Sequence, residues 1–422
     1  MIDPKILETY ADLVVTTGVN LRAGQCLLVN TAHGTYEFAR LIAKCAYVRG
    51  AKFVRINIID NQLVRYRIEA ANLEDLDWLP NYVTTESHEY LATDWARIRI
   101  DSTEELETLK GVDASLIARV QTAQRSALRR QQEALMRDQH SWLVIAAPGP
   151  RWARHVFRHS GPEYRDLAEN LSDEAITDRL WLELRKILRL DQADPVQAWK
   201  DHAAALQERC RKLDALRLAG LRFVNADTDL YVGLNPTSIW HGGGAVLPDG
   251  RAFMPNLPTE EVFTTPDFSQ TRGRVKAIRP VSVMESLVQE AWFEFEKGKI
   301  VRCGAKTGQD LLEKYIAIDE GAAFLGEVAL VAAESPIFSS GLLFGSILYD
   351  ENASCHIAIG AGYPSCLSNA AQLVSPAAVK AAGCNVSLVH TDFMIGTPTT
   401  DVTGIGGDGR EIPIIRQGSF VI

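Results

Sequence analysis

The stretch QCLLVNTAHGTYEFARLIAKCAYVRGAKFVRINII (residues 25–59) decides the fold class of the first half of the chain. It opens with an apolar run, QCLLVN, of the kind that forms a strand buried on both faces. Apolar side chains then recur at helical intervals up to Gly50, at Phe38, Leu41, Ile42, Cys45 and Ala46. AKFVRINII predicts a second strand, so the stretch is typical of a strand–helix–strand unit.

The same alternation continues towards the C-terminus. ARIRID (96–101) and SWLVIAAPGP (141–150) predict two further strands, and the polar segment from Ala114 to Arg137 predicts one long helix between them. Strands that alternate with helices form a parallel sheet with right-handed crossovers. We therefore predict an α/β domain from Met1 to about Gln192.

The second half of the sequence has a different pattern of apolar and polar residues. LRFVNADTDLYVGL, VKAIRPVSV and AWFEFEKGKIV alternate apolar and polar residues, and turn signals occur at Asp249-Gly250 and Lys297-Gly298. Pro195 lies between two helical patterns and marks a junction. We predict an antiparallel, β-rich α+β domain over residues 193–422.

Composition narrows the class of protein. Of the 422 residues, 46% are apolar and 23% charged, which is ordinary for a globular protein. A net charge of −9 argues against nucleic acid or anionic membrane as a partner. No segment reaches the ~18 apolar residues of a spanning helix, and the N-terminus does not resemble a signal peptide. The seven cysteines form no C-x-x-C pair, so we expect a reducing, cytoplasmic setting.

SLVHTDFMIG (387–396) places two ionisable residues in an apolar run. In a strand, His390 and Asp392 point to the same face because they are two residues apart. A buried carboxylate needs a cation or strong donors, and an imidazole with a carboxylate makes a half-site for a divalent metal. The alternative is a His–Asp hydrogen bond that closes the strand before the Gly396-Thr397-Pro398 turn.

Further candidate ligands lie in three other segments. PTEEVFTTPD carries Glu260 and Glu261, LGEVALV carries Glu327, and YDENASCHIAIG carries His356, with Tyr363 shortly after it. Each alone is compatible with a strand end or a satisfied core residue. Together they make a nitrogen and oxygen donor set for two divalent ions, which typically lie roughly 3.5–4 Å apart and share a bridging carboxylate.

Four segments in this order, PTEEVFTTPD, GEVALV, DENASCHIA and HTDFMIG, resemble the signature segments of the M29 family of thermophilic metallo-aminopeptidases, the aminopeptidase T and aminopeptidase S group. YADLVVTTGVNLRAGQ and DTDLYVGL also match, so the resemblance covers nearly the full chain. It implies an exopeptidase that acts on peptides, holds two divalent ions (Zn, Co or Mn) and assembles as a homodimer. FGSIL (344–348) and LSNAAQ (367–372) depart from the family's usual pattern, and neither departure removes a candidate ligand.

Residue-by-residue matching to the family implies five metal ligands: Glu261, Glu327, His356, His390 and Asp392. Which of the adjacent glutamates is the ligand stays open: the 66-residue distance to Glu327 favours Glu261, and Glu260 would then support a ligand or act as a base. Tyr363 matches the family's active-site tyrosine. In the resulting mechanism two ions activate a water, Glu260 or a non-bridging Glu327 carries the proton to the leaving amine, and Tyr363 donates a hydrogen bond to the oxyanion.

Two alternatives use the same residues. His356, His390 and Asp392 alone form the two-histidine, one-carboxylate set of mononuclear non-haem iron enzymes, such as ring-cleaving dioxygenases. A non-catalytic, metal-stabilised peptide-binding protein would show closed coordination and no turnover. The additional pair, Glu261 and Glu327, favours two metals and therefore the hydrolase.

Overall fold

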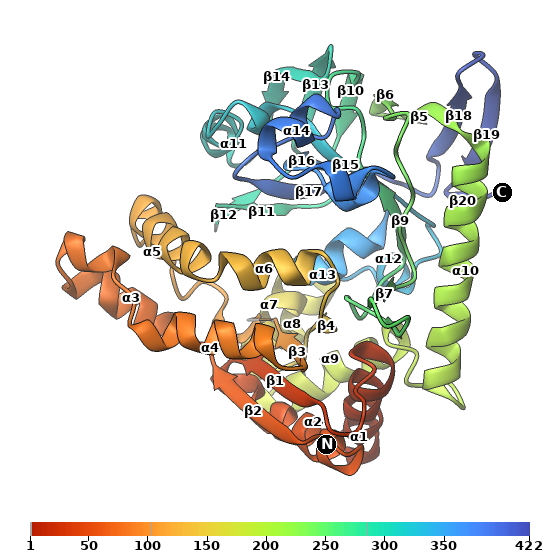
Figure 1. The fold of residues 1–422 in the computed structure, drawn as a ribbon. Coiled ribbons are helices and arrows are strands. Elements are labelled where there is room, and N and C mark those ends of the chain that lie inside the picture. Colours follow the sequence, from red (N-terminus) through yellow and green to blue (C-terminus); the bar gives the residue numbers. More distant parts are fainter. Residues whose placement is uncertain (1, 102, 285) are drawn as a thin grey trace. The chain divides into compact units, whose positions relative to one another are not determined.

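The computed structural model describes residues 2–101, 103–284 and 286–422. The chain forms two compact units that interleave along the sequence: Met1–Lys200 with Gly244–Pro258, and Asp201–Gly243 with Thr259–Ile422 (Figure 1). The division expected after Gln192 lies shortly before the first crossing, which falls inside helix α10 (Pro195–Leu216). Among the described residues, no helix is both long and apolar enough to cross a membrane.

The first unit contains a four-stranded parallel sheet in the order β2-β1-β3-β4. Its strands are β1 (Cys26–Thr31), β2 (Phe53–Ile58), β3 (Trp95–Ile100) and β4 (Trp142–Ile145). The helices are α1 (Pro4–Leu13), α2 (Tyr36–Val48), α3 (Asn61–Ala70), α4 (Asn81–Ala92), α5 (Ala114–Ala127), α6 (Arg129–Met136), α7 (Pro150–Ser160), α8 (Pro162–Asn170) and α9 (Asp173–Ile187). The predicted α/β domain with a parallel sheet is confirmed.

The prediction of a single helix from Ala114 to Arg137 is wrong in one respect. The segment forms two helices, α5 and α6, which meet at Leu128. The φ of −101° and ψ of 11° at Leu128 depart from the α-helical region. The sequence around Leu128 contains neither glycine nor proline, so no local signal marked the break.

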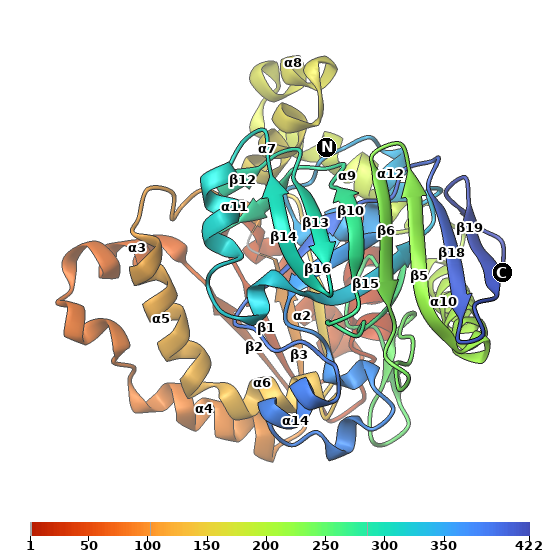
Figure 2. The same cartoon turned by 90° about the horizontal axis from the view of Figure 1, so that it is seen from above.

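The second unit is built from two antiparallel sheets, as predicted for a β-rich α+β region. The larger has the order β14-β13-β10-β6-β5-β18-β19-β20, most of which is visible side by side in Figure 2. Its strands are β5 (Leu218–Asn225), β6 (Thr228–Gly233), β10 (Arg272–Lys276), β13 (Trp292–Glu296), β14 (Lys299–Gly304), β18 (Asp401–Gly406), β19 (Glu411–Arg416) and β20 (Ser419–Phe420). The predicted Lys297-Gly298 turn joins β13 to β14 with both φ angles positive, at +48° and +83°.

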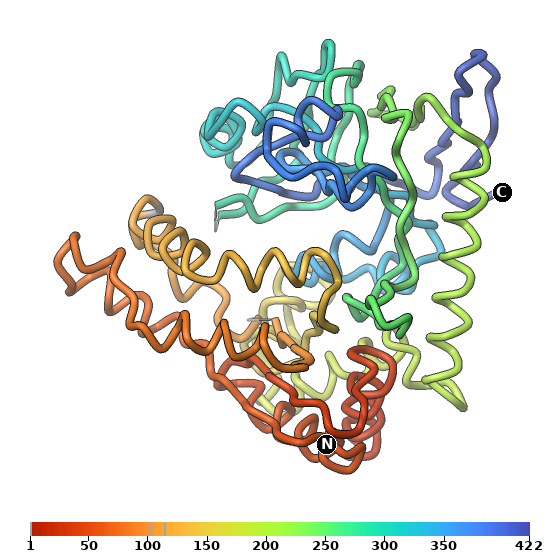
Figure 3. The backbone as a smooth tube through the Cα atoms, viewed as in Figure 1, coloured from red at the N-terminus to blue at the C-terminus, as the bar shows by residue number. Residues whose placement is uncertain are grey.

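The smaller sheet has the order β17-β16-β15-β9, and its strands run from the green to the blue part of the chain in Figure 3. They are β9 (Glu261–Thr264), β15 (Leu325–Val331), β16 (His356–Gly360) and β17 (His390–Met394). The remaining elements are the strand pairs β7 (Ala245–Val246) with β8 (Ala252–Phe253) and β11 (Val281–Val283) with β12 (Ser286–Val288), and the helices α11 (Gln309–Tyr315), α12 (Pro336–Ser339), α13 (Ile347–Asp350) and α14 (Pro376–Ala381).

One face of the smaller sheet is part of a hydrophobic core that it shares with the larger sheet. Val328, Ile357 and Phe393 belong to the same buried cluster as Phe223 and Phe293 of the larger sheet. The rings of Phe293 and Phe393 meet edge to face with their centroids 4.9 Å apart. The two sheets of this unit therefore pack as a sandwich, which fixes the smaller sheet as a rigid support.

Candidate metal centre

The strand register places all five expected ligands on the other face of the smaller sheet. Residues directly opposite one another in neighbouring strands share a face. Glu327 lies opposite Ala358, which in turn lies opposite Asp392. His390 lies opposite Gly360, and Glu261 lies opposite Val331. The face that results, called the polar face below, carries Glu261, Glu327, His356, His390 and Asp392.

Small residues separate the ionisable ones on the polar face. The positions between them are occupied by Ala329, Ala358 and Gly360. No bulky side chain therefore stands on this part of the sheet, and the long ionisable side chains have room to converge above it. An irregularity in the pairing at Gly326 brings Glu327 into its register. A Cβ at Gly326 would lie 2.1 Å from the carbonyl oxygen of Ala361, which leaves room only for glycine.

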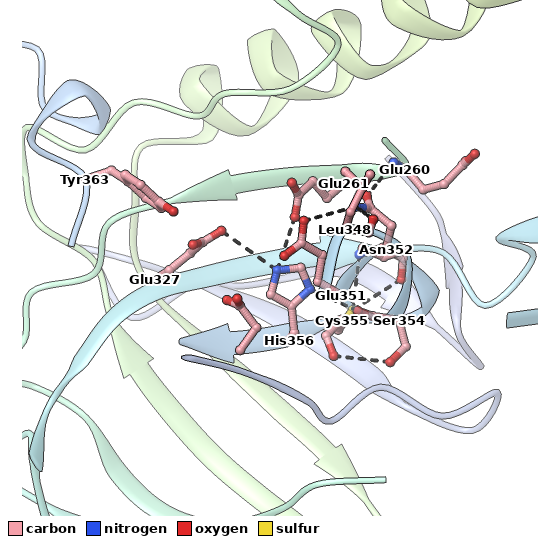
Figure 4. A network of polar contacts seen from close by, with 12 residues as sticks. Glu260, Glu261, Glu327, Leu348, Glu351, Asn352, Ser354, Cys355, His356 and Tyr363 are labelled. Atoms are coloured by element: carbon pink, nitrogen blue, oxygen red, sulfur yellow. Dashed lines mark hydrogen bonds and ion pairs between the residues drawn. The ribbon is translucent and has the colours of Figure 1, made fainter. Parts of the chain in front are cut away.

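The carboxylate of Glu327 joins two groups of potential ligands. Glu327 forms one group with Glu261 and His356, and a second with His390 and Asp392; within each group the candidate donor atoms lie within 4.8 Å of one another. Its Oε1 is 3.8 Å from the Nε2 of His356, and its Oε2 is 3.4 Å from the Nε2 of His390 (Figure 4 shows the first contact). Each oxygen of Glu327 thus faces a different imidazole.

In each group a second carboxylate, that of Glu261 or of Asp392, also lies close to the imidazole. The Nε2 of His356 lies 3.1 Å from Oε2 of Glu261, and the Nε2 of His390 lies 3.5 Å from Oδ1 of Asp392. These two carboxylate oxygens are buried. The arrangement is therefore a row of alternating carboxylates and imidazoles with Glu327 at its centre.

Both imidazoles are oriented by backbone carbonyl groups. The Nδ1 of His356 is 3.2 Å from the carbonyl oxygen of Ser354, and the Nδ1 of His390 is 2.7 Å from that of Ala361. A carbonyl oxygen only accepts, so Nδ1 carries the proton and donates it. This leaves only the Nε2 of each ring facing the carboxylates. Nε2 donates to them while the ring is protonated, and it offers its lone pair to a metal ion once that proton is lost, as in histidines that ligate metals.

Crowding of the carboxylates shifts their pKa values. Burial, reinforced by the charges of Glu327 and Asp392, raises the pKa of Glu261. Burial also acts to raise the pKa of Glu327, but hydrogen bonds from His356 and His390 outweigh it and lower the value to about 2. Carboxylates held this close together require positive charge at their centre, and two histidines with several carboxylates suit divalent transition metals.

The two adjacent glutamates point in different directions. The carboxylate of Glu260 lies 3.4 Å from the Nε2 of His202, and its side chain points away from the row that contains Glu261 (Figure 4). The structure therefore brings Glu261 to the cluster and does not bring Glu260, which was expected to carry a proton. The two differ because β9 begins at Glu261, whose side chain then follows the strand's alternation.

Tyr363 lies at the His390 end of the row. Its hydroxyl oxygen is 3.4 Å from the Nε2 of His390, and its ring packs edge to face on Phe263 with centroids 5.8 Å apart. Burial, together with the charges of Glu327 and Asp392, raises the pKa of Tyr363 well above its ordinary value. The phenol is therefore a neutral hydrogen-bond donor.

The sequence interpretation missed Glu351. It begins the 3₁₀ turn η6 (Glu351–Ala353), and its side chain lies beside His356 (Figure 4). Burial and the charges of Glu261 and Asp392 raise the pKa of Glu351 well above its ordinary value. The one available signal was an acidic residue shortly before His356 in YDENASCH, and such a residue in a loop is usually solvated.

Comparison with known proteins gives matches along nearly the whole chain. The thermophilic metalloprotease family M29 matches residues 4–420. Aminopeptidase AmpS of Bacillus subtilis is 36% identical over 98% of this chain and 98% of its own length. Aminopeptidase T of Thermus thermophilus is 36% identical over 99% of this chain and 98% of its own.

A solved structure shares the fold. The structure of wild-type AmpT from Thermus thermophilus superposes with a TM-score of 0.89 at 34% identity, covering 99% of this chain and 100% of that one. The predicted fold class is confirmed by this likeness. The chain therefore belongs to the thermophilic metalloprotease family M29, and the prediction of a metallo-aminopeptidase enzyme is confirmed.

Proposed function

We propose that the polar face holds two divalent metal ions, one on each side of Glu327, and that the protein releases N-terminal amino acids from peptides. The observation that carries this proposal is the Glu327 carboxylate, whose two oxygens face two different imidazoles. A carboxylate shared in this way is the usual bridge of a dinuclear site. The ligands on one side are Glu261 and His356, and on the other His390 and Asp392.

Charge supports a count of two ions. Glu351 adds a fourth carboxylate to those of Glu261, Glu327 and Asp392, and we assign it to the centre. Four carboxylates balance the four positive charges of two divalent cations, whereas one cation would leave two negative charges uncompensated in a buried place. The mixed imidazole and carboxylate donors suit Zn²⁺, Co²⁺ or Mn²⁺.

Two such ions held by these residues would lower the pKa of a bound water and polarise the scissile carbonyl group. The chain's own groups orient the reaction. His390 is the most open of the row, with 24% of its side chain exposed against 6% for Glu327, so a substrate reaches the row from the His390 end. Tyr363 stands at that end and can donate its hydroxyl hydrogen to an oxygen that gains negative charge. The placement of Glu260 does not support the role of proton carrier.

Metal content and substrate range together test this function. We expect elemental analysis of the loaded protein to find two divalent ions per chain, and a panel of aminoacyl chromogenic amides to be cleaved. The N-acetylated form of the best amide is the matched control and should resist cleavage, because an aminopeptidase requires a free α-amine. One iron per chain with no amide cleavage would contradict the proposal and favour the dioxygenase alternative.

We also propose a cytoplasmic homodimer. The described cysteines are free thiols, as in proteins of reducing compartments, and C2 dimers are the commonest symmetric assemblies. Light scattering at micromolar concentration tests the assembly, and a monomeric mass would contradict it.

A further inference from the structure

We propose that Asn352 is a positioning residue of the metal centre. Its side-chain amide holds the carboxylate of Glu351 towards the cluster and ties the turn that carries Glu351 to the strand that carries Glu261. The inference rests on the proposed metal-binding function and adds to it a residue that does not itself bind metal.

Asn352 is enclosed by the protein. It lies in η6, between Glu351 and Ala353, and its exposed fraction is 0%. An amide in such a place must find partners for its carbonyl oxygen and its NH₂ group, because an unsatisfied buried polar group is costly. The partners of Asn352 therefore reveal what the residue holds in place.

Three hydrogen bonds define the orientation of the amide. Its Oδ1 accepts from the backbone N–H of Glu260 at 2.7 Å. Its Nδ2 donates to the carbonyl oxygen of Leu348 at 3.0 Å and to Oε1 of Glu351 at 3.3 Å (Figure 4). Exchanging the amide oxygen and nitrogen would place donor against donor and acceptor against acceptor, so the chemistry of the partners fixes the orientation.

The bond to Glu260 acts on the neighbouring ligand. Glu260 immediately precedes β9, which begins at Glu261, and the Oε2 of Glu261 is 3.1 Å from the Nε2 of His356. The Asn352 amide thus links the start of β9 to a turn 92 positions further along the chain. A second bond reinforces the turn itself, since the hydroxyl of Ser335 donates to the backbone carbonyl of Asn352 at 2.8 Å.

The bond to Glu351 acts against charge repulsion. The carboxylate of Glu351 lies near those of Glu261 and Asp392, and like charges favour its rotation away from them. Glu351 is only partly buried, so such a rotation would expose it to water. The hydrogen that Nδ2 donates to Oε1 opposes this rotation. Without it, a metal ion would have to recruit the carboxylate from several orientations.

The first test is Asn352→Asp, which preserves size and the acceptor for Glu260 but replaces the NH₂ donor with a second oxygen. We expect Zn²⁺ affinity, measured by calorimetric titration of the metal-free protein, to fall about 10- to 100-fold, the usual effect of removing a group that orients a ligand. The visible absorption of the Co²⁺ form should change as well, because the coordination of the metal changes.

The matched control is Ser335→Ala, which loosens the same turn without touching the side-chain amide. Its Zn²⁺ affinity should stay within about twofold of the parent, even where its melting temperature in chelator falls. Equal losses of affinity in Asn352→Asp and Ser335→Ala would overturn the positioning role, because both would then report general loosening.

The decisive test is a double-mutant cycle with Glu351→Gln, which removes the carboxylate that Asn352 holds. If Asn352 acts through Glu351, adding Asn352→Asp to Glu351→Gln should reduce Zn²⁺ affinity by at most about threefold further, whereas the same substitution in the parent costs about 10- to 100-fold.

Two outcomes would overturn the inference: parent affinity in Asn352→Asp, or an equally large further loss when Asn352→Asp is added to Glu351→Gln. Failure of the proposed function gives a different signature. In that case the parent itself takes up no divalent ion in the same titration, before any variant is compared.

Discussion

The two faces of the sheet β17-β16-β15-β9 differ in kind although neighbouring residues build them. On β16, His356 belongs to the polar face and Ile357 to the hydrophobic core; on β17, Asp392 and Phe393 divide in the same way. The apolar face is packed on a second sheet, and the polar face gathers carboxylates that repel one another. Because side chains alternate along a strand with a period of two, one short segment can pack a rigid core on one face and hold reactive groups on the other.

The apolar face makes the polar face possible. Concentrating carboxylates costs free energy, which the packing of residues such as Val328 and Ile357 offsets, and that packing holds the proposed ligands in fixed register. Substitutions on the polar face should therefore alter metal binding and turnover, whereas substitutions on the apolar face should alter stability with or without metal. Five experiments test this separation.

The largest effect is expected at Glu327. Glu327→Gln keeps the shape of the side chain but removes the charge shared by both groups, so turnover should fall about a thousandfold or more, equivalent to about 4 kcal/mol of barrier. The matched control is Glu260→Gln, the same change on a glutamate that points away from the cluster, with an expected change within about threefold. Near-parental kcat of Glu327→Gln in metal-saturating buffer would show that Glu327 is a structural carboxylate.

The loss of stability on substituting the proposed outer ligands should depend on whether metal is present. With metal at about a thousand times Kd, binding stabilises the parent by about 4 kcal/mol, and His390→Ala or Asp392→Ala should lose most of this. In excess chelator the order should change for Asp392→Ala, which removes a buried carboxylate and should be at least as stable as the parent. Thermal melts with and without chelator measure both. If chelator does not change the melting temperature of the parent, and both variants lose the same stability in each buffer, then His390 and Asp392 form a structural hydrogen-bonded pair.

On the apolar face, Ile357→Ala should reduce the free energy of unfolding by about 3 kcal/mol, because Ile357 is fully buried. The loss should be the same with metal and with chelator, and Zn²⁺ affinity should be little changed. Denaturant titrations in both buffers provide the measurement. A loss confined to the metal-loaded protein would mean that the two faces are coupled.

The pH dependence of stability should reverse sign with metal. In the metal-free protein, burial raises the pKa of Glu261 and of Glu351. Burial acts to lower the pKa of His356, but the neighbouring carboxylates of Glu261 and Glu327 have the larger effect, so the pKa of His356 is also raised. A group whose pKa is higher in the folded protein than in the unfolded chain stabilises the fold fully at pH values below its unfolded pKa. This contribution is lost as pH rises through the folded pKa.

We therefore expect the metal-free protein to melt at lower temperature as pH increases from about 5 to 8. With metal, stability should increase over the same range because the ligands must lose protons to bind. Glu327, whose pKa is about 2, contributes with the opposite sign only in acid, where stability is lost as pH falls below its ordinary value. Parallel pH profiles in the two buffers would contradict this assignment of the charges.

The smallest effect is expected at Thr391, which lies between the proposed ligands His390 and Asp392 but on the apolar face. Its Oγ1 accepts a hydrogen bond from the hydroxyl of Tyr315 at 2.8 Å. Thr391→Val should therefore cost about 1 kcal/mol of stability and leave Zn²⁺ affinity within about twofold. A calorimetric titration that shows a tenfold loss would place Thr391 on the polar face.

Local features of the protein could be predicted from the sequence. Apolar runs and helical spacings predicted the parallel sheet of the first unit, and the spacing of His390 and Asp392 predicted a shared face. The four motifs carried the family assignment. These features depend on neighbours within a few residues, where backbone periodicity alone decides which way a side chain points.

Tertiary structure alone decided which residues converge. The register of β9 against β15 selects Glu261 over Glu260, and the buried amide of Asn352 joins positions 92 residues apart. Glu351 escaped the sequence interpretation because an acidic loop residue is usually solvated, and only its place beside three other carboxylates distinguishes it. The break between α5 and α6 and the return of Gly244–Pro258 to the first unit likewise lack a local signal. Each depends on contacts between distant segments, and sequence spacing does not encode their distance in space.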